Sequence, residues 1–273
     1  MSKYDLIAFD MDGTLLDSQK RIRPDSLKMI EKASQAGKIV CLSTGRCLPE
    51  LESYKEELSS MPYFICISAA LIYDNKNQEI ISSTPISSSI AEELFDRVKD
   101  KDLMIHILSD QSIINKEKIE EMPLYQMGNY QEAFRKNTRQ VDNVIDSWQK
   151  EKFPLYKINL YSKSPEKREI LLPQISDIDL TFTYSEITSI ECTAKGLSKA
   201  TGLKLLCQKL NIPLERTIAV GDADNDLEIM KASGLAVAMG NANQNIKNIA
   251  DVIVKSNDDG GCAQAISDYL LPL

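Results

Sequence analysis

Two aspartates at the end of an apolar run are the residues of this chain best suited to chemistry. Asp10 and Asp12 follow the run Leu6–Phe9, and Gly13 and Thr14 come directly after them. Two ionised carboxylates one residue apart repel each other, and removing them from water is costly unless a cation or a hydrogen-bond network compensates. A divalent metal ion is the simplest compensation, so this spacing indicates a metal-dependent site.

Two other interpretations of the same stretch are simpler. Asp and Gly are typical turn residues, so the segment could be an ordinary turn after a strand. A calcium-binding loop that began at Asp10 would need glycine where Leu15 stands and a bidentate glutamate where Arg21 stands. The calcium loop is therefore excluded, whereas the turn stays open when this stretch is taken alone.

A second acidic cluster, residues 221–226, follows the apolar run Thr217–Val220 and has the sequence Gly-Asp-Ala-Asp-Asn-Asp. Asp and Asn are also common at helix N-termini, so a simple helix cap is an alternative. If both apolar runs are strands of one parallel sheet, their carboxyl ends share an edge at which Asp10, Asp12 and Asp222 can converge on a cation. An all-oxygen set of few protein ligands favours Mg²⁺.

Hydroxyl and cationic groups elsewhere in the chain suit a phosphate, which Mg²⁺ commonly bridges to. Thr44, with the backbone amides of the Ser43–Gly45 turn, can bind phosphate oxygens. Lys199 is the candidate cation, although a solvated lysine at a helix start is the alternative. Zinc is disfavoured because the one histidine of the chain, His106, lies far from these motifs, and we expect it to be a surface or core residue.

The elements that must position these residues follow a strand and helix pattern at both ends of the chain. Short apolar runs predict strands that are buried on both faces. In the first part we expect strands Leu6–Phe9, Lys38–Leu42 and Tyr63–Ile67, helices Pro24–Ala36 and Leu48–Ser59, and a hairpin over Leu71–Ser82. In the last part we expect strands Thr217–Val220, Leu235–Ala238 and Asp251–Val254, and helices at 199–210, 224–232 and 243–249. This order predicts an α/β fold with a doubly wound, mostly parallel, Rossmann-like sheet.

The middle third has a different pattern. Strands Lys157–Tyr161 and Asp179–Tyr184 alternate polar with apolar residues, which predicts a sheet with one face open to solvent. Helices are expected at 88–101, within 117–127, at 142–152 and at 165–175. We therefore predict an inserted α+β domain at residues 83–189, between core segments 1–82 and 190–273.

Composition limits the class of protein. The 273 residues, 43% apolar and 26% charged, can bury one large core or two modest ones. A net charge of −8 without any basic run argues against nucleic acid or anionic membrane partners. Six cysteines without a Cys-x-x-Cys pair are typical of reduced core residues and predict a cytoplasmic protein. We expect neither secretion nor membrane insertion, because the first residues include Asp5 and no long apolar region, and no stretch approaches the roughly 18 apolar residues that a membrane span needs. The oligomeric state is not indicated.

Four motifs in order resemble those of the haloacid dehalogenase superfamily of phosphotransferases, specifically its Cof-type subfamily of small-molecule phosphatases with a large α+β cap. They are Asp10–Thr14, Ser43–Arg46, Ser198–Lys199 and residues 221–226, each at a predicted strand end or helix start. The resemblance covers nearly the whole chain. It implies a Mg²⁺-dependent phosphatase that hydrolyses a small phosphorylated metabolite, foremost a sugar phosphate, through an aspartyl-phosphate.

The resemblance also implies a role for each matching residue. Asp10 would be the nucleophile, and Asp12 would be the general acid and then the general base. Mg²⁺ would be held by the carboxylates of Asp10 and Asp222 and by the backbone carbonyl of Asp12, while Asp226 would orient the surroundings of the metal. The phosphoryl oxygens would be bound by Thr44, Lys199, the Met11 amide, Gly45 and Asn225.

Two positions depart from the family pattern. Family members commonly carry Asn-Gly-Ala after the third strand, where this chain has Ser68–Ala70, so an amide that can face the substrate is missing. Ala200 stands where a glycine often follows the motif lysine. Specificity is expected to lie in the cap. Arg46 and Lys157 are candidates to contact the leaving group, with a solvated role equally open for Lys157, and Tyr161 is expected to pack.

Three other functions compete with hydrolysis. A phosphomutase of the same superfamily would return the phosphoryl group to a substrate instead of to water. A signalling receiver domain uses similar residues, but the tandem Asp10 and Asp12 and the large insertion argue against it. A metabolite sensor without catalytic activity stays open because of the departure at Ser68 and Ala69.

Overall fold

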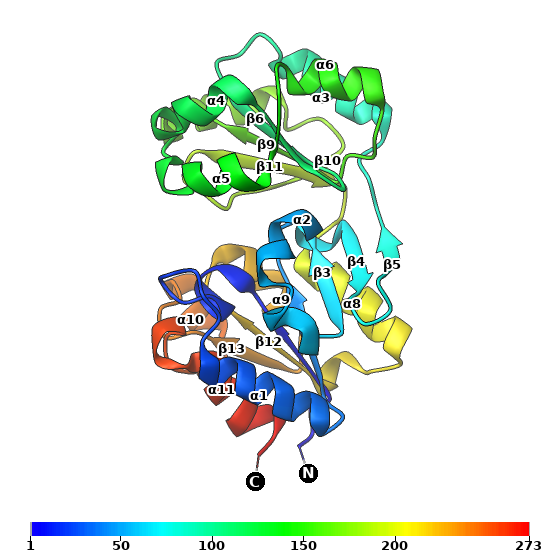
Figure 1. Cartoon of the computed structure of the whole chain (residues 1–273), viewed down its shortest axis with the longest axis vertical. Coiled ribbons are helices and arrows are strands. Elements are labelled where there is room, and N and C mark those ends of the chain that lie inside the picture. The colour runs from blue at the N-terminus through cyan, green and yellow to red at the C-terminus, as the bar shows by residue number, and fades with distance from the viewer. Residues whose placement is uncertain (1, 273) are drawn as a thin grey trace. The chain divides into compact units, whose positions relative to one another are not determined.

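A computed structural model describes residues 2–272, which form two compact units (Figure 1). The core unit contains the segment that ends at Gly45, the segment Tyr54–Ser83, and the segment that begins at Ser198. The cap unit contains Thr84–Leu197 and also Arg46–Ser53. The sequence predicted an inserted domain with borders after residues 82 and 189. These borders concern which parts fold independently, and they stay a prediction.

The core unit is built on an eight-stranded sheet in the order β14-β13-β12-β1-β2-β3-β4-β5. Its parallel strands are β14 (Val252–Ile253), β13 (Leu235–Ala238), β12 (Thr217–Gly221), β1 (Leu6–Phe9), β2 (Ile39–Ser43) and β3 (Tyr63–Cys66). β4 (Leu71–Asp74) and β5 (Glu79–Ser83) add an antiparallel hairpin at one edge. The predicted α/β class, with a mostly parallel sheet and an inserted cap, is confirmed.

The helices of the core unit follow the strands as expected from their apolar spacing. They are α1 (Pro24–Gln35), α8 (Lys199–Leu210), α9 (Leu227–Ala232), α10 (Gln244–Ile249) and α11 (Gly261–Ala265). The predicted helix Leu48–Ser59 is wrong, because α2 ends at Leu51 and two short 3₁₀ helices follow it. Leu51 and Leu58 are the apolar residues that this stretch buries, too few for the stripe that stabilises a continuous helix.

The cap unit contains a second sheet of six strands in the order β10-β11-β9-β6-β7-β8. The strands are β6 (Met104–Leu108), β7 (Ser112–Asn115), β8 (Arg139–Val141), β9 (Lys157–Tyr161), β10 (Leu180–Thr183) and β11 (Ser189–Ala194). The helices are α3 (Ser88–Val98), α4 (Lys116–Glu121), α5 (Gln131–Asn137), α6 (Val144–Glu151) and α7 (Pro165–Leu171). Of the six strands, the sequence predicted β9 and β10.

The two faces of the cap sheet differ in chemistry. One face carries Ile107, Ile158 and Ile190, which pack in an apolar core with α3, α6 and α7 around Trp148. The other face carries polar residues, but the prediction that it is open to solvent is wrong, since β9 is buried at all five positions. The solvated alternative for Lys157 is wrong for the same reason, because only 3% of this residue is exposed.

Two further expectations concern buried residues and membrane segments. His106 is buried in the cap sheet, which agrees with a core role, and Tyr161 packs in a small apolar cluster with Met104 and Tyr125. All six cysteines are buried, and none of them forms a disulfide. Among residues 2–272, the structure contains no helix whose length and apolar character would let it cross a membrane.

Candidate active site

The first acidic motif lies where β1 ends in the middle of the core sheet. β1 pairs with β2 on one side and with β12 on the other. The Asp10 amide continues the pairing with β12 by donating a hydrogen bond to the Val220 carbonyl at 3.0 Å. All four residues of β1 are buried. Asp10 therefore leaves the sheet at a fixed position and is itself only 7% exposed.

The turn after Asp10 brings the two acidic motifs into contact. Gly13 has a φ of +79°, and a Cβ at this position would lie 2.4 Å from Oδ2 of Asp222. Thr14 Oγ1 donates a hydrogen bond to Oδ1 of Asp222 at 2.8 Å. Glycine is thus required here both for its backbone conformation and for the close approach of Asp222. Sequence reasoning assigned no role to Thr14, and nothing in its spacing distinguishes it from an ordinary turn residue.

Lys199 reaches this site from the first turn of α8. The helix starts with a capping box, in which Ser198 Oγ accepts from the Thr201 amide. Gly202 allows close packing, because a Cβ there would lie 2.4 Å from a methyl group of Ile65 in β3. Lys199 is 1% exposed, and its Nζ lies 2.5 Å from Oδ1 of Asp10 and 2.6 Å from Oδ1 of Asp226. The solvated alternative for Lys199 is therefore wrong.

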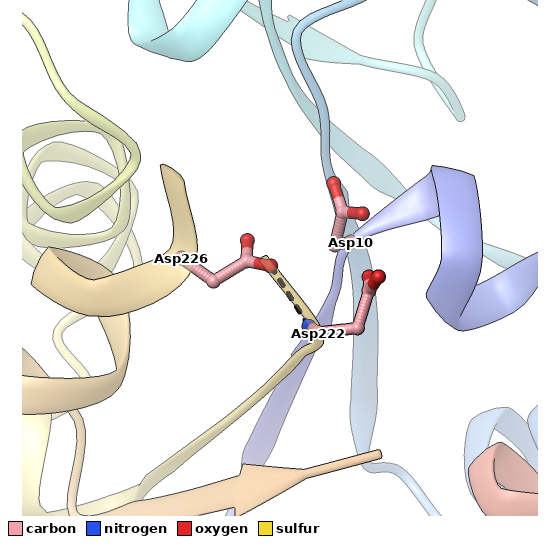
Figure 2. Close-up of side chains that lie close together, drawn as sticks. All are labelled: Asp10, Asp222 and Asp226. Atoms are coloured by element: carbon pink, nitrogen blue, oxygen red, sulfur yellow. Dashed lines mark hydrogen bonds between the residues drawn. The ribbon is translucent and has the colours of Figure 1, made fainter. Parts of the chain in front are cut away.

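Asp226 connects Lys199 to the second acidic motif. Its Oδ2 accepts hydrogen bonds from the amides of Asp222 and Ala223 at 3.0 and 3.2 Å, while its Oδ1 pairs with Lys199. Figure 2 shows the side chains of Asp10, Asp222 and Asp226 together, with the bond from Asp226 to the Asp222 backbone. Oxygen atoms of these three carboxylates lie within 4.8 Å of one another.

The charges of this cluster are not balanced. Among the described residues 2–272, Lys199 alone provides the ion pairs of Asp10 and Asp226. Burial raises the pKa of Asp10 to about 8 against the opposing effect of Lys199, and Asp226 and Asp222 add to the rise. Burial likewise raises the pKa of Asp222 to about 6. Burial alone would lower the pKa of Lys199, but Asp10 and Asp226 raise it above its ordinary value, so this residue is an ammonium ion.

This donor set fits a hard divalent cation. The ligand atoms are carboxylate oxygens, and their surplus negative charge is what such a cation compensates. Both oxygens of Asp226 already accept hydrogen bonds, from Lys199 and from backbone amides. Asp10 and Asp222 are therefore the residues whose side chains would hold the metal, with Asp226 fixing the loop that carries Asp222.

Asp12 lies outside the carboxylate cluster. Its side chain is 41% exposed and forms an ion pair with Lys20 at 2.8 Å. Met11, between the two aspartates, is fully buried. The predicted acid and base role of Asp12 stays a prediction, as does the predicted contact of its backbone carbonyl with a metal.

The second motif follows β2, the neighbour of β1. Thr44 is 2% exposed, and its backbone is held between Ile65 and Ser68, donating to the Ile65 carbonyl at 2.8 Å and accepting from the Ser68 amide at 3.0 Å. Gly45 is the last residue of this core segment, and Arg46 belongs to the cap unit. The predicted phosphate contacts of Thr44 and Gly45, and the predicted substrate contact of Arg46, stay predictions.

Two oxygen atoms in these loops are buried without a hydrogen-bond partner. They are Oγ of Ser43 at the end of β2 and Oδ1 of Asn225 in the second acidic motif. Buried polar atoms that lack partners are uncommon and often mark ligand sites. The predicted role of Asn225 in phosphate binding stays a prediction that this observation favours.

The segment that departs from the family pattern is strained. Ile67, Ser68 and Ala69 have φ angles of +51°, +52° and +82°, a region that residues other than glycine rarely adopt. The tertiary structure holds them there, since Ser68 donates to Thr44 and Ala69 packs beside Gly202. Such strain is typical of functional loops, and the sequence showed no sign of it.

Comparison with known proteins is consistent with this geometry. The family model for haloacid dehalogenase-like hydrolases matches residues 7–266. The chain is 30% identical to the phosphatase YwpJ of Bacillus subtilis, over 97% of this chain and 99% of that protein. It is 29% identical to 5-amino-6-(5-phospho-D-ribitylamino)uracil phosphatase YcsE of the same organism, over 97% and 96%. A solved haloacid dehalogenase-like hydrolase from B. subtilis superposes with a TM-score of 0.86 at 27% identity, over 96% of this chain and 98% of that one.

The fold and the family match define a phosphoric monoester hydrolase that acts on small phosphorylated metabolites. The chain belongs to the haloacid dehalogenase-like hydrolase family, in the Cof-type group of phosphatases with an inserted α+β cap. The resemblance seen in the four sequence motifs is thereby confirmed. Membership of this family also implies a divalent metal ion, with which the acidic cluster is consistent.

Proposed function

We propose that this phosphatase depends on Mg²⁺ and hydrolyses its substrate through an aspartyl-phosphate on Asp10. The observation that carries the proposal is the contact of Lys199 with both Asp10 and Asp226, beside Asp222, at the carboxyl ends of β1 and β12. This cluster joins a nucleophile, a cation for the phosphoryl oxygens and a set of metal-binding oxygens. Phosphoryl transfer needs mainly such positioning and charge neutralisation.

In the first step a carboxylate oxygen of Asp10 attacks the phosphorus atom, and the bond from phosphorus to the leaving oxygen breaks. Asp12 donates a proton to that oxygen, which leaves as an alcohol. In the second step Asp12 takes a proton from a water molecule that attacks phosphorus, the bond to Asp10 breaks, and inorganic phosphate is released. The exposed position of the Asp12 carboxyl beside Lys20 supports this role, because the leaving group and water must both reach it.

Mg²⁺ would be held by the side chains of Asp10 and Asp222 and by the backbone carbonyl of Asp12. When bound, the ion supplies charge neutralisation for the phosphoryl oxygens. Asp226 keeps the Asp222 loop in place through its bonds to the backbone amides. The phosphoryl oxygens would be bound by Lys199, the Met11 amide, Thr44, Gly45 and Asn225.

For the substrate, a sugar phosphate is the compound class that we propose first, with Arg46 as a candidate contact to its leaving group. YcsE, whose name specifies a phosphate on a ribitylamino group, supports a sugar or sugar-alcohol phosphate. We also infer a cytoplasmic protein, because none of the six buried cysteines forms a disulfide.

Release of inorganic phosphate from p-nitrophenyl phosphate, with and without Mg²⁺, tests the proposal. The Asp10→Asn variant should lose at least about a thousand-fold in rate, since it removes the nucleophile. Asp224→Asn is the matched control. It removes a carboxylate of the same acidic motif whose partners are Asn243 and Asn245, and it should keep the activity.

Two outcomes would contradict the proposal. Wild-type protein that releases no phosphate with Mg²⁺ would exclude hydrolysis, and full activity in Asp10→Asn would exclude the aspartyl-phosphate. With a sugar phosphate as substrate, transfer of the phosphoryl group to a second hydroxyl without phosphate release would identify a phosphomutase instead.

A further inference from the structure

Residues 239–243, which follow β13 directly, contact both acidic motifs of the core unit. Because β13 runs parallel to β12, this segment leaves the sheet at the same edge as the second acidic motif. The Met239 amide donates a hydrogen bond to the Gly221 carbonyl at 3.0 Å, and the Asn243 amide donates one to the Asp222 carbonyl at the same distance. We call residues 239–243 the bridging segment.

The middle of the bridging segment reaches the first acidic motif through Asn241. The Nδ2 atom of Asn241 donates a hydrogen bond to the Gly13 carbonyl at 2.7 Å. Gly13 lies in the turn Met11–Leu15 that follows Asp10. The bridging segment therefore holds one acidic motif with its own backbone and the other with a side chain.

The orientation of the Asn241 amide is fixed by a second hydrogen bond. The backbone amide of Asn257 donates to Oδ1 of Asn241 at 2.9 Å, and a backbone amide can only donate. Asn257 is itself held in place, because its side chain donates to the Leu16 carbonyl at 2.9 Å. The oxygen of Asn241 thus faces Asn257, and its NH₂ group faces Gly13.

Gly13 is the residue of this turn that most needs such a restraint. Glycine has the widest range of backbone conformations, and Gly13 adopts a φ of +79°. The Asp12 carbonyl comes directly before it, so the direction of that carbonyl depends on the conformation of Gly13. The peptide group after Gly13 is held by Asn241, and Thr14 is bonded to Asp222. Together these bonds set the Asp12 carbonyl relative to the second acidic motif.

We propose that Asn241 is a positioning residue of the metal site, which directs the Asp12 carbonyl by holding the Gly13 carbonyl. The proposal rests on the proposed function, in which the Asp12 carbonyl and the Asp222 side chain hold Mg²⁺. It deepens that function by adding a residue that lies outside all four sequence motifs. Asn241 is exposed, and a single exposed hydrogen bond contributes little to folding, so its effect on the metal can be separated from its effect on stability.

Calorimetric titration of the substrate-free protein with Mg²⁺ tests the proposal. We expect Asn241→Ala to bind Mg²⁺ about ten-fold more weakly, as is typical when a group that orients a metal ligand is removed. Its melting temperature without Mg²⁺ should stay near that of the wild-type protein. Asn245→Ala is the matched control, because this exposed asparagine donates to Asp224 instead of to the turn. Unchanged affinity in Asn241→Ala, or an equal loss in Asn245→Ala, would overturn the proposal.

A second variant isolates the bond to Gly13. In Asn241→Asp the side chain can still accept from the Asn257 amide, but a carboxylate cannot donate to the Gly13 carbonyl. The added negative charge by itself favours a cation. We therefore expect weaker Mg²⁺ binding in this variant only if the donated hydrogen bond positions the site. Equal or tighter binding than in the wild-type protein would overturn the proposal.

The dependence of activity on Mg²⁺ separates positioning from a loss of the fold. In Asn241→Ala, the Mg²⁺ concentration that gives half of the maximal release of phosphate from p-nitrophenyl phosphate should rise by the same factor as the calorimetric constant. The kcat at saturating Mg²⁺ should stay near the wild-type value, because Asp10, Asp12 and Lys199 are unchanged. A loss of kcat that saturating Mg²⁺ does not restore would contradict the proposal.

Failure of this proposal can be distinguished from failure of the proposed function. If the wild-type protein binds Mg²⁺ but releases no phosphate, the proposed function fails, and calorimetry of Asn241→Ala still decides the role of Asn241. If the wild-type protein is active and Asn241→Ala binds Mg²⁺ equally well, the positioning role alone is overturned. A wild-type protein that binds no Mg²⁺ would overturn both.

Discussion

The acidic cluster of the core unit and a row of polar residues on the cap sheet are both largely buried, but the first has an excess of charge and the second has an unpaired neutral atom. We call the second group the polar row, and its residues are Thr183, Glu191, Asn159 and His106. In the core, Asp10, Asp222 and Asp226 face one ammonium, Lys199, so negative charge is in excess. In the cap, Glu191 is paired with Lys157, so the charges balance and a neutral acceptor is left over. An excess of charge calls for a cation, whereas an unpaired amide oxygen calls for a neutral donor.

Removing the buried lysine of each unit tests this difference most strongly. Lys199→Met and Lys157→Met each leave a buried carboxylate without its partner, which should lower the free energy of unfolding by about 3–5 kcal/mol. We expect saturating Mg²⁺ to recover part of this loss in Lys199→Met and none in Lys157→Met. Urea unfolding at pH 7 with and without Mg²⁺ measures both effects. If Mg²⁺ recovered the same amount of stability in both variants, an excess of negative charge would not be particular to the core unit.

The pH dependence of stability tests whether the polar row is neutral. Burial lowers the pKa of His106 from 6.5 to about 4, so between these values the unfolded chain binds a proton that the folded chain does not. The stability that His106 contributes is thus complete above pH 6.5 and is lost as pH falls toward 4, by up to about 3 kcal/mol. Urea unfolding at several pH values in this range measures the free energy of unfolding. In His106→Gln this free energy should depend less steeply on pH than in the wild-type protein.

Because His106 is the one histidine of the chain, its own titration provides the control. The imidazole signals of the folded protein should show no titration above pH 5. A midpoint above pH 6 would contradict the neutral state of the buried His106 ring.

A pair of glycines tests the smaller effects in the core. Gly13→Ala and Gly37→Ala both place a side chain at positive φ, but a Cβ at Gly13 meets Asp222 at 2.4 Å, whereas one at Gly37 meets nothing within 4 Å. Gly37→Ala should cost about 1 kcal/mol from backbone strain alone. Gly13→Ala should cost more and weaken Mg²⁺ binding, since Asp222 must move. Thermal unfolding measures the loss of stability in each variant, and Mg²⁺ titration measures the change in affinity. Equal losses of stability and affinity in the two variants would show that Gly13 does not confine Asp222.

Much of the core was predictable from the sequence. Its strands are short apolar runs without alternation, and the acidic motifs follow them directly, so the parallel pairing of β1 with β12 brings Asp10 and Asp222 to the same edge of the sheet. Lys199 joins them from the first turn of α8. The strain at Ile67, Ser68 and Ala69 was not predictable, because it arises from contacts with Thr44 and with α8 that only the folded chain creates.

The cap was less predictable for a physical reason. Charged and polar residues that alternate along a strand usually face water, so the sequence of β9 indicated an open face. In the structure, Lys157 and Glu191 lie on the neighbouring strands β9 and β11, although they are 34 positions apart in the sequence. They neutralise each other inside the cap unit. Such pairing depends on strand register, and the contact of Asn159 with His106 could be recognised only when the positions of both residues on neighbouring strands were known.

The segment Arg46–Ser53 has a consequence for engineering this enzyme. Because the segment belongs to the cap unit, the chain passes from one unit to the other four times, the first time directly after Gly45. Glu50 in this segment accepts from Ser112 and also from the Cys47 amide. A cap transplanted from a relative as one continuous insert would leave Glu50 behind and separate it from its cap partner. A working chimera should therefore exchange residues 46–53 together with 84–197.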